Sequence, residues 1–148
     1  MIKFTKAFLV ILFLAPMFLF GQEFKKSDLT NDWKLFSENN GLKMFLRSET
    51  CKIEGAPKPF DYVFIKLENT TSEEKTIDFQ LGLNYQETCV GCSTEDHEAK
   101  RNFTIPANTT WMGDNTFVRG KMSYLIQNHN GLDNKTFKSI KLIYLNIQ

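Results

Sequence analysis

The chain has 148 residues, of which 18 are basic and 17 acidic, so its formal net charge at pH 7 is +1. This balance argues against nucleic acid and against an anionic membrane surface as binding partners. The length allows a single domain with one hydrophobic core, and no low-complexity tract or internal repeat interrupts it.

Residues 1–21 have the pattern of a secretory signal peptide. Lys3 and Lys6 precede an apolar run of fourteen residues, Ala7–Phe20, and Gly21 supplies a small residue for cleavage. The run is shorter than the ~20 residues of a membrane span. We therefore expect cleavage after Gly21 and a secreted or periplasmic product that is not embedded in a membrane. Removing Lys3 and Lys6 from the 18 basic residues leaves 16, against 17 acidic ones.

The remainder of the chain predicts antiparallel β structure. Residues 22–32 are polar, and we expect them to form a flexible lead-in to a domain at 33–148. Short apolar or β-branched segments then alternate with turn signals such as Asn40-Gly41, which is typical of a tight hairpin. The expected strands are Trp33–Glu38, Leu42–Glu49, Phe60–Glu68, Ile77–Tyr85, Lys100–Ile105, Thr109–Met112, Phe117–Ile126 and Phe137–Ile147. About seven or eight strands at this spacing predict an immunoglobulin-like antiparallel β-sandwich.

Two of these segments have clear patterns. Phe60–Glu68 is apolar on both faces, which predicts a central strand. In Ile77–Tyr85, apolar and polar residues alternate with a period of two, so one face is expected in the core. We expect Phe79 to point inward and Gln80 to point into solvent.

Strand counting predicts where the cysteines lie. If every strand reverses direction, Cys51 and the loop that holds Cys89, Cys92 and His97 lie at one end of the sandwich, which we call the Cys51 end. The same count takes Asn115 to this end. It places His129 at the opposite end.

Three interpretations of the Cys51 end remain open from the residues. A disulfide is favoured because exported proteins meet an oxidising compartment. Cys51, Cys89, Cys92 and His97 are candidates for a tetrahedral metal site, although one Cys-x-x-Cys pair is a weak signal. A thioredoxin-like redox pair is disfavoured because the sequence offers no helix to lower the thiol pKa.

The motifs resemble those of a group of small, secreted, uncharacterised β-sandwich proteins of Gram-negative bacteria. The segments that carry the resemblance are Cys51, Phe60–Asn69, Cys89–Cys92, Phe103–Thr110 and Gly113-Asp114. The group implies a fourth cysteine after Gly113-Asp114, where this chain has Asn115. The resemblance therefore implies that Cys51 lost its partner and that Cys89 and Cys92 pair locally, although the strand count also allows Cys51 to bond either one.

No motif for catalysis or for a cofactor stands out, and we expect a binding or structural module more than an enzyme. The ligand is expected to be a protein or a glycan. Trp33, Phe103 and Trp111 could cover apolar sugar faces, but such rings more often pack inside the fold. A metal- or thiol-handling protein that uses the Cys51 end is the alternative function.

Overall fold

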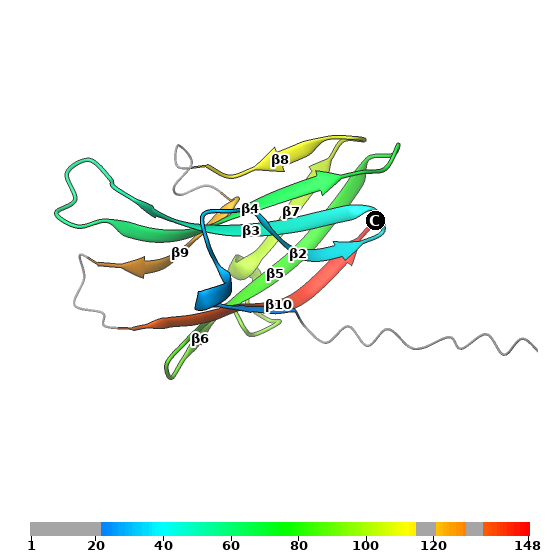
Figure 1. Cartoon of the computed structure of the whole chain (residues 1–148). Coiled ribbons are helices and arrows are strands. Elements are labelled where there is room, and N and C mark those ends of the chain that lie inside the picture. The colour runs from blue at the N-terminus through cyan, green and yellow to red at the C-terminus, as the bar shows by residue number, and fades with distance from the viewer. Residues whose placement is uncertain (1–21, 115–120, 130–134) are drawn as a thin grey trace, which may run out of the picture.

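The computed structural model describes residues 22–114, 121–129 and 135–148. In this part of the chain ten strands form two antiparallel sheets that pack face to face (Figure 1). Sheet A contains β1 (Glu23–Lys25), β10 (Phe137–Ile147), β5 (Lys75–Tyr85), β6 (Cys89–Val90) and β7 (Lys100–Ile105). Sheet B contains β2 (Lys34–Asn39), β3 (Leu42–Cys51), β4 (Phe60–Asn69), β8 (Thr110–Met112) and β9 (Ser123–Asn128). The predicted all-β antiparallel sandwich is confirmed, and its immunoglobulin-like character stays a prediction.

The strand count exceeds the expected seven or eight because two short strands of sheet A, β1 and β6, were not predicted. In sheet A, β6 and β7 both pair with β5, at successive positions along it. In sheet B, β8 and β9 both pair antiparallel with β4, β8 at Lys66–Glu68 and β9 at Phe60–Phe64. Two strands that are antiparallel to the same neighbour run in the same direction. The expected reversal between β8 and β9 is therefore wrong, and β9 ends at the Cys51 end.

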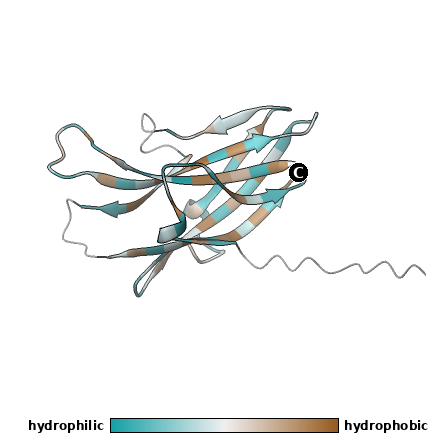
Figure 2. Cartoon of the chain, viewed as in Figure 1, coloured by the Kyte–Doolittle hydropathy of each residue, from teal (hydrophilic) through white to brown (hydrophobic). Residues whose placement is uncertain are grey.

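The inward faces of β3, β4, β5 and β10 build one hydrophobic core between the sheets. Phe79 on β5 is fully buried there, as its alternating pattern predicted. Val63 and Ile65 on β4 face the core, whereas Tyr62 and Phe64 are buried on the opposite face of the same strand. The prediction that β4 is apolar on both faces is thus confirmed, and Figure 2 shows hydrophobic and hydrophilic residues alternating along the strands.

The segment 22–32 is part of the sandwich, so the expected flexible lead-in is wrong. β1 pairs with β10, and a 3-10 turn at Lys26–Asp28 carries the chain from sheet A to sheet B. Leu29 is buried in the core, and the Thr30 carbonyl accepts a hydrogen bond from the Ser48 amide. The segment has few apolar residues, but Phe24 packs edge-on against Phe36 and so joins the two sheets.

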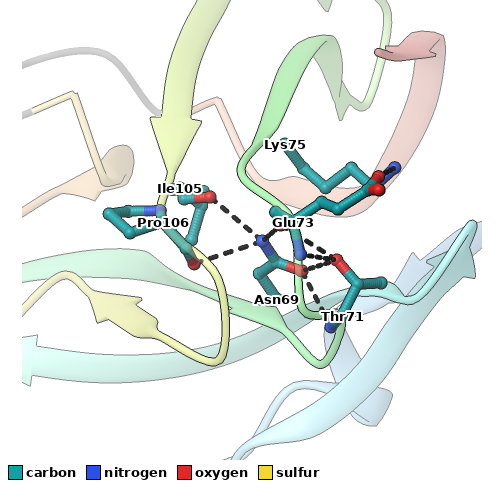
Figure 3. A network of polar contacts seen from close by, with 6 residues as sticks. All are labelled: Asn69, Thr71, Glu73, Lys75, Ile105 and Pro106. Carbon is teal, nitrogen blue, oxygen red and sulfur yellow. Dashed lines mark hydrogen bonds and ion pairs between the residues drawn. The ribbon is translucent and has the colours of Figure 1, made fainter.

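The end of the sandwich opposite Cys51 is closed by the side chain of Asn69 (Figure 3). Its amide nitrogen donates to the carbonyls of Glu73, Ile105 and Pro106, and its oxygen accepts from the amide and hydroxyl of Thr71. These bonds tie the β4–β5 turn to the β7–β8 connection. The nearby hairpin has positive φ at Asn40 and Gly41, as its Asn-Gly sequence predicted.

Candidate functional site

The three cysteines do not gather into one cluster. Cys89 and Cys92 form a disulfide on sheet A, with their Cα atoms 5.7 Å apart. Cys51 ends β3 in sheet B, where it is free and buried. The local pair implied by the resemblance therefore matches the structure, whereas a bond from Cys51 to either of the others does not form.

The disulfide lies on the outer face of sheet A, against β5. A Cβ atom on Gly82 would lie 2.5 Å from the Cys92 sulfur, so the loop approaches this strand closely because Gly82 has no side chain. Gln80, two residues earlier, donates hydrogen bonds to the carbonyls of Gly91 and Ser93 at 2.8 and 2.6 Å. Gln80 is fully buried by this loop, so the expectation that its side chain meets solvent is wrong.

The metal candidates are not brought together. His97 begins a 3-10 turn, His97–Ala99, that leads into β7 at the edge of sheet A. Cys51 lies in the other sheet, and Cys89 and Cys92 are bonded to each other. Among residues 22–114, 121–129 and 135–148, which include all four candidates, no three His, Cys, Asp or Glu side chains form a group that could hold a metal ion.

His129 lies at the Cys51 end, and the prediction that it lies at the opposite end is wrong. Its Nε2 is 2.9 Å from Asp61 Oδ2 near the start of β4, and the Thr50 hydroxyl donates to Asp61 Oδ1 at 2.6 Å. The cause is the shared direction of β8 and β9. Asn115, the other residue of the predicted cluster, lies outside the described residues.

A hollow of about 180 Å³ opens beside Asp61, between the N-terminal segment and the ends of β3 and β9. Its lining includes Lys26, Leu29, Asn31, Ser48, Glu49, Thr50, Asp61 and Ile126. Lys26 reaches across to the Gln127 side chain at 3.4 Å. The hollow mixes one ammonium group, carboxylates and aliphatic carbon, and this composition does not single out a class of ligand.

The outer face of sheet B, which points away from the core, combines aromatic and aliphatic side chains with charged ones. Directly opposed residues share a face, so the strand registers define four rows across it. Read from the β2 side, the rows are Glu38, Lys43, Glu68 and Thr110; Leu35, Phe45, Lys66 and Met112; Arg47, Phe64 and Ser123; and Glu49, Tyr62 and Leu125. Trp33 lies beside Arg47. We call this surface the outer B face.

Aromatic rings and cations cover one another at the centre of the outer B face. The Arg47 guanidinium lies 4.9 Å from the Trp33 ring centroid and 5.2 Å from that of Phe64. The Lys66 ammonium lies 3.9 Å from the Phe45 centroid. Such cation–π contacts stabilise by about 0.5–2 kcal/mol, depending on how far the cation is desolvated. They also hold the cations flat against the sheet.

The free thiol of Cys51 belongs to the same face. It packs with Tyr62 and Phe64 in a small cluster that is separate from the main core. Burial raises the pKa of the Cys51 thiol, the Glu49 carboxylate adds to this rise, and Arg47 partly offsets it. The thiol is therefore held in its protonated, unreactive form.

Large aliphatic side chains remain exposed around the outer B face. Leu35 is 46% exposed, Leu125 43% and Met112 56%. The three residues considered for a sugar platform lie apart, because Trp33 is on this face whereas Phe103 packs edge-on against Trp111 between β7 and β8. Sequence reasoning missed the outer B face, although Phe60–Glu68 has apolar residues on both of its faces, which pointed to a second buried side.

Comparison with models of known protein families, with curated proteins and with solved structures found no match to this chain. In the described part of the chain no helix has the length and apolarity that a membrane crossing requires.

Proposed function

We propose that this chain acts outside the cytoplasm as a protein-binding module and that the outer B face is its contact surface. The observation that carries the proposal is the exposure of Leu35, Met112 and Leu125 on a face whose centre is aromatic. The solvent-facing side of an antiparallel sheet is normally polar. We interpret the exposed aliphatic side chains at both edges of this face as contacts for a protein partner.

The accessible groups favour a protein over a glycan. A ring that binds sugar presents an open face, but Tyr62 is only 4% exposed and Phe64 is fully buried. The Lys66 ammonium lies over the ring of Phe45. What a partner would meet is aliphatic carbon with charged groups between, which is the composition of protein interfaces.

Two observations support export. Residues 1–21 carry the signal-peptide pattern, and the Cys89–Cys92 disulfide is of the kind that persists in oxidising compartments. Fractionation and N-terminal sequencing of the expressed chain test this part. We expect a protein that begins at Gln22 outside the cytoplasm, and an uncleaved chain inside the cell would contradict export.

Site-specific photocrosslinking in the producing cells tests the contact surface. A photoreactive residue at Leu125 should give a protein adduct, and Met112→Glu in the same chain should remove it. The matched control is a photoreactive residue at Val90, which is 54% exposed but belongs to sheet A. Equal adducts at the two positions, or none at Leu125, would overturn the proposal.

A further inference from the structure

We propose that the protein bound by the outer B face is a second copy of this chain. The two copies pack face to face about a twofold axis that runs parallel to the strands, between β3 and β4. The inference rests on the proposed function, because it names the occupant of the same surface.

The charges on the outer B face sum to zero. The three cations are Lys43, Arg47 and Lys66, and the three carboxylates are Glu38, Glu49 and Glu68. Two ion pairs join them, Lys43 with Glu38 at 3.9 Å and Arg47 with Glu49 at 3.0 Å. A strongly acidic or basic partner gains little from such a face. A surface that carries the same alternating charges is its natural complement.

The strand register makes the face complementary to itself. A twofold axis in the plane of the interface, parallel to the strands, places β3 of one copy over β4 of the other. Each residue keeps its level along the strands, so each row meets the same row of the second copy in reverse order. The facing pairs are Lys43 with Glu68, Phe45 with Lys66, Arg47 with Phe64 and Glu49 with Tyr62.

One facing pair joins opposite charges. Lys43 of one copy meets the Glu68 carboxylate of the other, so opposite charges face each other. In the middle rows the rings are already covered within each copy, Phe45 by Lys66 and the fully buried Phe64 by Arg47, so these rows add no cation–π contact between the copies. Because the axis exchanges the copies, the contact between Lys43 and Glu68 occurs twice.

The exposed aliphatic side chains at the two edges of the outer B face also face each other in the dimer. Leu35 on the edge strand β2 and Met112 on β8 end the same row, on either side of Phe45 and Lys66. The axis brings Leu35 of one copy over Met112 of the other, so two exposed aliphatic side chains are buried together. Sheets pack in this way at about 10 Å in ordinary sandwiches. A twofold contact is closed, so it yields a dimer and not a filament.

Sedimentation analysis of the mature chain over a wide concentration range tests the inference. We expect a monomer–dimer equilibrium that Met112→Glu and Leu35→Glu each abolish. Val90→Glu is the matched control, since Val90 is 54% exposed and Met112 56%, and it should leave the dimer intact. Unchanged thermal melting of each variant shows that the fold is kept. A monomer at every concentration, or a dimer that survives both rim variants, would overturn the inference.

A charge exchange tests the axis itself. In Lys43→Glu two carboxylates face each other twice, and in Glu68→Lys two ammonium groups do so, which should weaken each dimer by roughly tenfold. An equimolar mixture of the two variants restores opposite charges at both contacts, so the mixed dimer should recover the original affinity. A mixture no stronger than either variant alone would exclude this axis.

The photocrosslink at Leu125 separates the two proposals. An adduct of twice the chain mass supports both of them. An adduct with a different protein, together with a monomer in sedimentation, supports the proposed function and overturns the second copy. No adduct and no dimer would overturn both.

Discussion

The outer faces of the two sheets are covered in different ways. On sheet A, the loop that follows β6 folds back over β5, where a disulfide and two hydrogen bonds from Gln80 hold it. On sheet B, the side chains cover themselves, because Arg47 and Lys66 lie across the aromatic rings. The part of sheet A around Gln80 is therefore covered by its own chain, whereas the outer face of sheet B keeps aliphatic side chains at its edges that a partner can bury.

The difference shows that burial on an outward face has more than one cause. Gln80 and Phe64 are both fully buried outside the main core, one under a polar loop and the other in an aromatic cluster. Loss of Gln80 breaks hydrogen bonds, and loss of Phe64 leaves a cavity. These mechanisms have different costs, so substitutions on the two faces can separate them.

The largest effect is expected at Phe64. Phe64→Ala should lower the free energy of unfolding by about 3–5 kcal/mol, as for a large core side chain, although the residue points away from the main core. Urea denaturation measures this. The control is Tyr144→Ala on β10, a residue that is 39% exposed, and this change should cost about 1 kcal/mol or less. A similarly small loss at Phe64 would mean that the aromatic cluster does not behave as a core.

Gln80→Ala should cost about 2–3 kcal/mol. The change removes two hydrogen bonds and leaves the carbonyls of Gly91 and Ser93 without these donors under a closed loop. The exposed Thr104 on neighbouring β7 provides the control, and its change to Ala should cost about 0.5 kcal/mol or less. Equal denaturation midpoints for the two variants would show that the loop does not depend on Gln80.

Removal of the disulfide should cost about 2 kcal/mol. Cys89 and Cys92 close a loop of only four residues, for which the chain-entropy relation gives a stabilisation near this value. Thermal denaturation of the double variant Cys89→Ala/Cys92→Ala measures the loss. Reduction should lower the stability of the parent chain by a similar amount and leave the double variant unchanged. A reductant effect that persists in the double variant would point to another cause.

The fold class could be predicted from the sequence because periodicity and turn residues are local signals. The alternation from Ile77 to Tyr85 and the Asn40-Gly41 turn each depend on neighbouring residues alone. The position of His129 was predicted wrongly because strand counting assumes a reversal after every strand. No local pattern reports that β8 and β9 share one side of β4.

The outer B face could be predicted only in part. Both faces of Phe60–Glu68 are apolar in the sequence, which indicates a second buried side. The rows that place Lys66 beside Phe45 and Arg47 beside Phe64 depend on the register between β3 and β4. Likewise, the local sequence pattern predicts that Gln80 lies on the surface. The loop that buries it follows eleven residues further along the chain, so the local pattern does not reveal this burial. The register between two strands and the packing of a loop over a strand both depend on tertiary structure.

The smallest and most specific effect concerns Cys51, the only free thiol when Cys89 and Cys92 are bonded. Burial raises its pKa, and the neighbouring Glu49 carboxylate raises it further. Because the thiolate is the reactive form, alkylation of the folded chain should be slow near pH 9 and should accelerate at higher pH than in the unfolded chain. Mass spectrometry follows the single adduct.

The same shift gives the sign of a stability effect. The folded state holds the Cys51 proton more tightly than the unfolded state does, and this difference stabilises the fold. The stabilisation is complete below the pKa of the unfolded state and is lost as the pH rises through the pKa of the folded state. Cys51→Ser, whose hydroxyl does not ionise in this range, should remove that alkaline loss. If the folded and unfolded chains were alkylated with the same pH dependence, Cys51 would be open to solvent. The aromatic cluster of sheet B would then not be shielded from solvent by its own side chains, and the contrast with sheet A would fail.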